Sequence, residues 1–371
     1  MKVVIAPDSF KGSLEAPEVA EAIACGLRRE SPEIETVLLP VADGGEGTVE
    51  AVRRAFGGEL VTVTVHDPLM REIEASFLLA GERAVIEMAA ASGLPLLSEE
   101  ERDAWRATSY GTGELIAEAI HRGAKEILLG IGGSATNDGG TGMCQALGAR
   151  FLDQEGKDAG FGARCAERTV RVELESLRKL LSGVKITAMC DVVNPLCGPA
   201  GATYVYGPQK GAVDLPALDA ALRNLTKVVG GTFQDCPGAG AAGGLGFALM
   251  AFCGAELCSG IDAVLDLCEF ERHCVGADLI LTGEGRADGQ SASGKVVSGI
   301  LSRAGKIPVV VFAGGLGDGA ERLYEAGVSV LLPIGDRPMS LAESMARTEQ
   351  LLESAARRLW RTLMVGYELK K

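Results

Sequence analysis

Short apolar runs alternate along this chain with loops rich in glycine, aspartate and serine and with amphipathic helical patterns. The first such unit predicts a strand at residues 3–6, a loop through Ser13 and a helix with Pro17 in its first turn. The same order returns after apolar runs near residues 37–39 and 127–131, and in the segments DLILTGEGRADGQ and PVVVFAGGLGDG. This alternation predicts an α/β fold with a parallel sheet. Because loops at the carboxyl ends of parallel strands line the binding crevice, we expect these polar loops to converge.

The middle of the chain follows a more mixed pattern. The stretch VTVTVHDPLMREIEASFLLAGERAVIEM places strand-rich runs on either side of turn residues, which is typical of hairpins. Residues 1–68 and 277–371 keep the cleaner alternation of strands and helices. We therefore predict a discontinuous first α/β domain of residues 1–68 plus 277–371, into which a second α/β domain of residues 69–276 is inserted.

Charge and cysteine usage exclude several classes of protein. The formal net charge is -14 and no run of Lys or Arg occurs, so neither nucleic acid nor an anionic membrane is an expected partner. The ten cysteines form no CxxC pair, and we expect them to be thiols in a reducing cytoplasm. Residues 236–255 carry no charge, but they contain a proline and six glycines, so we expect a glycine-rich loop and a buried helix there rather than a membrane span.

The segment TGEGRADGQSASGK contains part of a P-loop pattern. Gly289, Gly294 and Lys295 stand at the spacing GxxxxGK. In a P-loop the first glycine follows its strand directly, and a hydroxyl residue follows the lysine. Here the strand is expected to end near Thr282, and Val296 follows the lysine, so the segment is not a P-loop.

The same segment still gathers polar residues after a buried strand. Glu284, Arg286 and Asp288 lie within five positions, a density that favours a functional site. The alternative is a solvated turn before a helix capped by Ser291 or Ser293, which would explain one polar residue and leave the others unexplained.

The segment GIGGSATNDGG, residues 130–140, is the second candidate. Its glycine amides, together with the side chains of Ser134, Thr136 and Asn137, would suit a nucleotide phosphate chain, with Asp138 near the accompanying metal ion. The spacing GxGxxA also matches a dinucleotide-binding fold, although residues 136–138 interrupt the helix that this fold requires. A tight turn without a ligand is the third alternative.

Three further loops place polar residues just after predicted strands. APDSFKGS carries Asp8, Ser9 and Lys11, VADGGEGT carries Asp43 and Glu46, and CDVVNPLCGPAG carries Asp191 and Asn194. The alternative roles are helix caps for the first two loops and an Asx turn in the third.

Carboxylates, amides and a few cations dominate these loops. The three histidines lie in none of them, and no GxSxG motif occurs. Carboxylates and cations are what phosphoryl transfer requires, because it depends on positioning, Mg²⁺, charge neutralisation and a base for the alcohol proton.

Long motifs in these loops resemble one family. APDSFKGS, PVADGGEGT, SYGTGELI, GIGGSATNDGG, CDVVNPLCGPAGATYVYGPQKGA, GAGAAGGLGF and LILTGEGRADGQSASGKV together resemble the bacterial glycerate kinases, over nearly the full length of the chain. The resemblance implies ATP-dependent phosphorylation of D-glycerate at the 2-hydroxyl, giving 2-phosphoglycerate. It also implies a Rossmann-like first domain and an active site in the cleft between the two domains.

With this resemblance in view, the chemistry of each loop suggests a role for its residues. The ATP phosphates are assigned to Gly132, Gly133, Ser134, Thr136 and Asn137. Asp191 is the first candidate for the catalytic base, and Asp288 or Glu284 is the second. Glycerate or the transferred phosphoryl group is assigned to Lys11, Arg286 and Ser9. Mg²⁺ is assigned to Asp8, Asp43 and Asp138.

Other activities and properties remain open from the sequence. Phosphorylation could instead give 3-phosphoglycerate, and an NAD(P)-dependent hydroxy-acid oxidoreductase or a non-catalytic protein that binds sugar acids are alternatives from other classes. A cytoplasmic location is expected, with glycerate and ATP as the small-molecule partners, and a homodimer is one oligomeric state to test.

Overall fold

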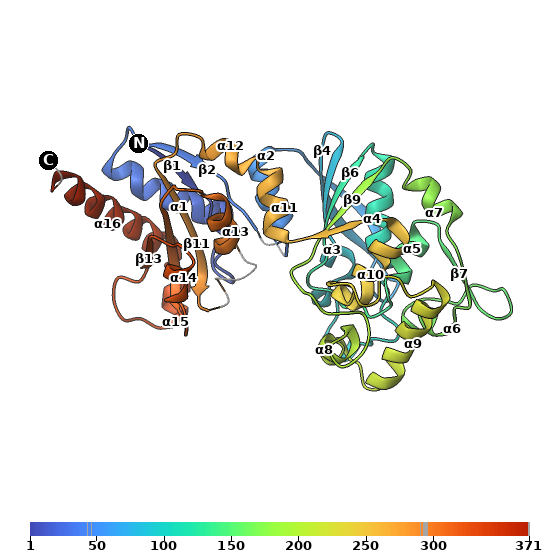
Figure 1. Ribbon diagram of the computed structural model, residues 1–371. Helices are drawn as coiled ribbons and strands as arrows, with labels where there is room; N and C mark the ends of the chain where they lie inside the picture. Colours follow the sequence, from blue (N-terminus) through green and yellow to red (C-terminus); the bar gives the residue numbers. More distant parts are fainter. Residues whose placement is uncertain (43, 46, 290, 292–295, 370–371) are drawn as a thin grey trace. The chain divides into compact units, whose positions relative to one another are not determined.

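A computed structural model describes residues 1–42, 44–45, 47–289, 291 and 296–369 of the chain (Figure 1). The chain divides into two compact units, each built from separate segments. Unit 1 consists of Met1–Asp43, Glu50–Gly57 and Ile261–Lys371, and unit 2 consists of Gly44–Val49 and Gly58–Gly260. The fold class is α/β, as the alternating pattern predicted.

Unit 1 is built on a parallel sheet with the strand order β13-β12-β11-β1-β2. Its strands are β1 (Lys2–Ile5), β2 (Glu35–Leu38), β11 (Leu279–Ala287), β12 (Val309–Leu316) and β13 (Val330–Pro333). Its helices are α1 (Ala16–Glu30), α2 (Thr48–Phe56, which begins in unit 2), α11 (Gly260–Leu267), α12 (Phe270–Cys274), α13 (Val296–Arg303), α14 (Arg322–Glu325), α15 (Leu341–Ala346) and α16 (Thr348–Glu368).

Helices α1 and α16 lie side by side against this sheet (Figure 1). The apolar stripe of α1, which includes Ile23 and Leu27, packs in one core cluster with Leu352 and Ala356 of α16. Gly26 lets the helices approach closely, because a Cβ atom there would lie 2.4 Å from the carbonyl oxygen of Glu353. Helix α1 has a proline in its first turn, as the sequence predicted.

Unit 2 is built on a mixed sheet with the strand order β10-β9-β6-β5-β4-β3. β3 (Glu59–His66), β4 (Glu72–Ala80) and β5 (Arg83–Glu87) pair in antiparallel fashion, which confirms the hairpins expected there. The pairs β5–β6, β6–β9 and β9–β10 are parallel. These last strands are β6 (Glu126–Gly130), β9 (Lys185–Met189) and β10 (Glu256–Cys258), and β7 (Arg150–Leu152) and β8 (Arg171–Glu173) form a separate antiparallel pair.

The helices of unit 2 surround a large apolar core that includes Phe77, Phe151 and Phe247. They are α3 (Ala89–Ser92), α4 (Tyr110–His121), α5 (Thr141–Ala146), α6 (Ala163–Arg168), α7 (Glu175–Leu180), α8 (Ala202–Tyr206), α9 (Leu215–Val228) and α10 (Ala241–Cys253), with 3₁₀ turns at Leu94–Leu96, Glu99–Glu101 and Pro208–Lys210.

The uncharged stretch 236–255 becomes a glycine-rich loop and the buried helix α10, as expected. In the described part of the chain, no helix has the length and apolar character needed to cross a membrane.

The predicted domain limits differ from the division into units. They fell after residues 68 and 276, whereas β3 belongs to unit 2 because it pairs with β4, and α11 and α12 belong to unit 1. An active site in a cleft between two domains stays a prediction.

Strand β11 is longer than the sequence indicated. Thr282 was the expected end, but β11 continues to Ala287 because β12 runs beside it, pairing Glu284 with Ala313 and Arg286 with Gly315. Glycines lower the strand propensity of this stretch, which is why the sequence alone predicted a loop.

Candidate active site

The carboxyl ends of three parallel strands in unit 2 lie next to one another. Glu87, Gly130 and Met189, the last residues of β5, β6 and β9, are register partners across the sheet. The loops that follow these strands therefore leave from one edge, which is where parallel α/β sheets bind their ligands.

The loop at Gly44 and Gly45 covers this edge. A Cβ atom on Gly130 would lie 2.6 Å from the carbonyl oxygen of Gly44, and one on Gly44 would lie 2.7 Å from the Cβ of Met189. Gly44 also has a φ of +87°, so glycine is required there on two grounds. Glu87 fixes the end of the loop, since its Oε1 accepts a hydrogen bond of 2.8 Å from the amide of Val49.

The glycine-rich segment after β6 has an exposed beginning and a buried end. Gly132 and Gly133 are exposed, whereas Ser134, Thr136 and Asn137 are buried. Within the described residues, Thr136 Oγ1 and Asn137 Oδ1 have no hydrogen-bond partner, and Asn137 Nδ2 donates to Thr203 Oγ1 at 3.0 Å. Buried polar atoms without partners indicate room for a ligand or for water.

The start of helix α10 packs against the backbone of this glycine-rich segment. Gly243 has a φ of +68°, and a Cβ atom there would lie 2.0 Å from the carbonyl oxygen of Thr136. Its own carbonyl accepts a hydrogen bond of 2.9 Å from the amide of Gly139. The motif GAGAAGGLGF is therefore rich in glycine because two backbone segments meet there.

Lys210 lies almost fully buried behind the same segment, with 2% of its surface exposed. Its Nζ donates to Ser134 Oγ and to the carbonyl oxygen of Thr136, both at 2.7 Å. Burial lowers the pKa of Lys210 to about 7, and the charge of Asp138 opposes that shift. A buried ammonium group thus lies directly beneath the predicted phosphate-binding residues.

Asp138 is fully buried and accepts hydrogen bonds on both carboxylate oxygens. Its Oδ1 accepts from the amide of Gly140 at 3.0 Å. Its Oδ2 accepts from the amide and the hydroxyl of Ser109, each at 2.8 Å, from the amide of Gly142 at 3.2 Å and from Thr108 Oγ1 at 3.5 Å. These donors are what a structural carboxylate has, so they favour a structural role over the predicted binding of a metal ion.

Asp191 follows β9 and is exposed at the same edge of the sheet. Its Oδ1 accepts a hydrogen bond of 3.0 Å from the amide of Gly260, which holds the carboxylate in one orientation. An exposed and oriented carboxylate has the geometry expected of a general base.

In unit 1 the loop after β1 lies beside β11. The amide of Asp8 donates to the carbonyl oxygen of Gly283 at 2.9 Å, and Asp8 Oδ1 accepts from the amide of Ser9 at 2.7 Å. A Cβ atom on Gly285 would lie 3.5 Å from the backbone nitrogen of Lys11. The structure thus brings two of the predicted loops together at the carboxyl edge of this sheet.

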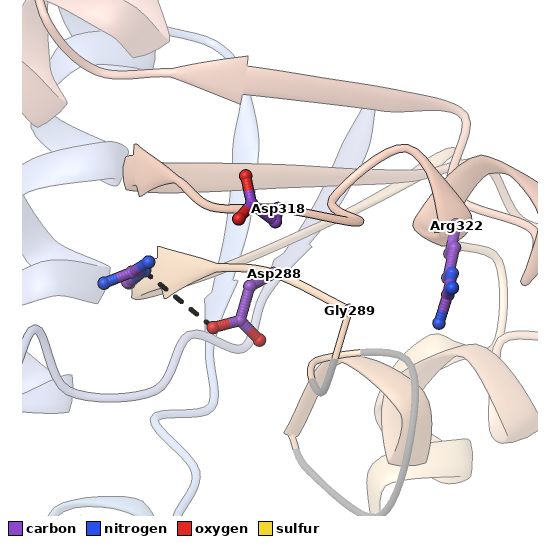
Figure 2. A pocket seen from close by; sticks show the side chains of 5 residues that line it. Asp288, Gly289, Asp318 and Arg322 are labelled. Carbon is purple, nitrogen blue, oxygen red and sulfur yellow. Dashed lines mark ion pairs between the residues drawn. The ribbon is translucent and has the colours of Figure 1, made fainter.

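A polar pocket of about 340 Å³ lies next to these loops, at the ends of β11 and β12 (Figure 2). It is lined by Arg286, Asp288, Gly289, Asp318 and Arg322. Arg286 is exposed, and its Nε lies 3.8 Å from Asp288 Oδ2. Glu284 is buried on the same strand.

Known proteins resemble this chain over its whole length. The family model for the "Glycerate kinase family" matches residues 3–364. A protein named glycerate kinase from Halalkalibacterium halodurans is 44% identical over 96% of this chain and 97% of its own length. A protein named glycerate 2-kinase from Escherichia coli K12 is 44% identical over 99% of both chains.

The fold comparison agrees. A crystal structure of a protein assigned as glycerate kinase 2 from Salmonella typhimurium LT2 matches with a TM-score of 0.90, at 43% identity over 99% of both chains. The chain belongs to the glycerate kinase family. It is therefore an enzyme, a kinase, and the family resemblance seen in its motifs is confirmed.

The predicted site residues of this family member fall into two groups. Unit 2 holds the glycine-rich segment 132–138 and Asp191, and unit 1 holds the loop at residues 8–11 and Glu284, Arg286 and Asp288. Asp43 and Lys295 lie outside the described residues. Every role assigned to these side chains stays a prediction.

Sequence reasoning gave no role to three residues that the structure places at these sites. Lys210 lies near the end of the motif CDVVNPLCGPAGATYVYGPQKGA, and its contact with Ser134 could not be predicted because the two residues are 76 positions apart in the chain. Asp318 and Arg322 follow β12 in the segment GGLGDGAER, whose position after a buried strand was the available signal.

Proposed function

We propose that this kinase transfers the γ-phosphoryl group of ATP to the 2-hydroxyl of D-glycerate, giving 2-phosphoglycerate and ADP. The observation that carries the proposal is the 44% identity to the Escherichia coli glycerate 2-kinase over 99% of both chains. The resemblance extends over nearly the whole of both chains.

The nucleotide phosphates are proposed to bind along residues 132–137. Exposed glycines allow phosphate oxygens to approach backbone amides closely, and a buried cation behind the segment lowers the energy of bound anions. Ser134 and Thr136 add hydroxyl donors at the same place. Thr136 Oγ1 is buried without a protein partner among the described residues, and its hydroxyl can donate to such a ligand.

Asp191 is the proposed base. It would take the proton of the glycerate 2-hydroxyl as that oxygen forms its bond to the γ-phosphorus, while the bond from phosphorus to the β,γ-bridging oxygen breaks and ADP leaves. Its hydrogen bond from the amide of Gly260 orients the carboxylate at this edge of the sheet. Asp288 and Glu284 are the second candidates for this role.

Unit 1 supplies the proposed ligands of glycerate. Lys11 and Arg286 are exposed cations at the carboxyl edge of its sheet, and a small carboxylate substrate requires cationic partners. Ser9 lies in the loop beside β11 and could donate a hydrogen bond to a substrate oxygen. These residues provide charge for the substrate and polar groups for its hydroxyls.

Mg²⁺ is a proposed cofactor that would neutralise charge on the ATP phosphates. Among the residues described, no three His, Cys, Asp or Glu side chains gather as a metal site. A phosphate-bound Mg²⁺ needs only one or two protein carboxylates, because phosphate oxygens and water complete its shell. Asp8 is the carboxylate proposed for this smaller requirement. Asp138 accepts five hydrogen bonds from protein donors.

The cellular setting and assembly are also proposals. The ten cysteines are thiols and not disulfides in the structure, which is consistent with a reducing cytoplasm. Glycerate and ATP are the proposed small-molecule partners. A homodimer is proposed as the oligomeric state to be tested by light scattering.

A coupled assay tests the reaction and its regiochemistry. The enzyme is incubated with ATP, MgCl₂ and D-glycerate together with enolase and pyruvate kinase, and pyruvate is measured with and without phosphoglycerate mutase. Pyruvate without mutase supports 2-phosphoglycerate, whereas pyruvate only with mutase would show 3-phosphoglycerate. An absorbance change at 340 nm with NAD(P) and glycerate, without ATP, would support the oxidoreductase instead.

A further inference from the structure

Lys210 is a buried cation to which the sequence analysis assigned no role. Its Nζ donates to two neutral oxygens, Asp138 acts on it through its charge, and only 2% of its surface is exposed. Burying an ammonium group without a directly hydrogen-bonded carboxylate is costly, so such a group beside a glycine-rich loop is a candidate for binding an anion.

The two hydrogen bonds of Lys210 orient its neighbours. Ser134 Oγ accepts from Nζ at 2.7 Å, so the hydroxyl hydrogen of Ser134 must point to a different acceptor. Nζ also holds the carbonyl oxygen of Thr136 at 2.7 Å, which fixes the backbone of the segment. An ammonium group has three hydrogens, and the two contacts use two of them.

Polar atoms without partners lie at the same place. Thr136 Oγ1 and Asn137 Oδ1 are buried, and neither finds a hydrogen-bond partner among the described residues. Together with Ser134, the segment presents hydroxyl donors above a buried positive charge. The hydroxyls of Ser134 and Thr136 suit an oxyanion, because each donor can then find an acceptor, whereas Asn137 Oδ1 only accepts and requires a donor such as water.

We propose that Lys210 is the positioning residue for the nucleotide phosphates. Its ammonium group fixes residues 134–136 so that their hydrogen-bond donors face the phosphates, and its positive charge is neutralised by the negative charge of the phosphates. This inference rests on the proposed function, since it takes ATP as the phosphate donor. A purely structural tie between the Pro208–Lys210 turn and the segment is the competing explanation.

Replacing the ammonium group with an apolar chain of similar length tests the inference. For Lys210→Met, we expect ADP to bind about 30-fold more weakly by isothermal titration calorimetry in buffer with MgCl₂, because a charged hydrogen-bonding group is lost. Binding of adenosine, measured by ligand-observed NMR, should change by less than about twofold. The matched control is Lys227→Met on the exposed side of α9, which should leave both affinities unchanged.

Other outcomes would overturn the inference. ADP affinity within about threefold of the parent, or an equal loss for ADP and adenosine, would show a structural tie instead. If Lys210→Met does not fold, Ser134→Ala replaces it. That variant should weaken ADP binding about fivefold because one oriented donor is lost, and an unchanged affinity refutes the inference.

The inference and the proposed function fail in different ways. Binding of ADP that depends on Lys210, in a protein that makes no phosphoglycerate, would refute the proposed reaction and leave the phosphate site standing. Formation of 2-phosphoglycerate with an ADP affinity that is insensitive to Lys210 would refute the inference alone.

Discussion

Replacement of Asp138 by asparagine distinguishes a structural carboxylate from a metal ligand. The carboxylate accepts five hydrogen bonds from two segments of unit 2, residues 108–109 and 140–142, four of them on Oδ2 and one on Oδ1. An amide has one acceptor oxygen. Whichever way it turns, its NH₂ group must face at least one backbone N–H, that of Gly140 or that of Ser109.

The magnitude follows from these contacts. Each buried donor left without an acceptor costs about 1–3 kcal/mol, and the remaining bonds lose the strength that the charge gave them. We therefore expect Asp138→Asn to lower the free energy of unfolding by about 3 kcal/mol. The same loss is expected without Mg²⁺, because the donors belong to the protein.

Urea unfolding followed by far-UV circular dichroism, with and without MgCl₂, measures this loss. Asp158→Asn is the surface control, since that carboxylate is exposed, and it should change stability by less than about 0.5 kcal/mol. A loss below about 1 kcal/mol for Asp138→Asn in metal-free buffer, with a reduced response to Mg²⁺, would refute the structural role and favour a metal ligand.

Three further changes are predicted. Asp191→Asn should lower kcat about a hundredfold or more with ADP affinity kept, as measured by steady-state kinetics and calorimetry, and near-normal turnover would remove Asp191 from the role of base. Gly243→Ala should lower the free energy of unfolding in urea by at least about 3 kcal/mol, because its Cβ would lie 2.0 Å from the carbonyl oxygen of Thr136. Gly231→Ala is the control: its φ of +72° is similar but the space around it is open, so it should cost only about 1–2 kcal/mol. Burial lowers the pKa of Lys210 from 10.5 to about 7 in the folded state. Unfolding therefore takes up a proton between these two pH values, and the free energy of unfolding should rise by about 1.4 kcal/mol per pH unit relative to Lys210→Met. Equal pH profiles of stability for the two proteins would contradict the burial of this charge.

Much of the fold could be predicted because its signals are local. The strand near residues 127–131 and the helix that begins around Pro17 follow from apolar periodicity within a few turns of chain. The antiparallel hairpin of β3 and β4 was equally readable from its alternating pattern. The extension of β11 to Ala287 was not, because its glycines form a strand only when β12 supplies the pairing partners.

The candidate site was likewise predictable only in part from the sequence. Clusters of glycine and aspartate after apolar runs showed which loops carry polar groups, and the topology places those loops at the carboxyl edges of two sheets. The acidic residues looked alike in sequence. Packing distinguishes them, since Asp138 is buried among donors whereas Asp191 is exposed and accepts a hydrogen bond from the amide of Gly260.

By itself, the sequence determined the α/β class, the family and the loops that carry chemistry, because periodicity, glycine clusters and long motifs are properties of neighbouring residues. Only the tertiary structure decided which groups meet. Lys210 stands 76 residues from Ser134 in the chain, and their contact exists because the Pro208–Lys210 turn packs behind the segment after β6. Burial then lowers the pKa of that lysine, and burial exists only in the folded chain.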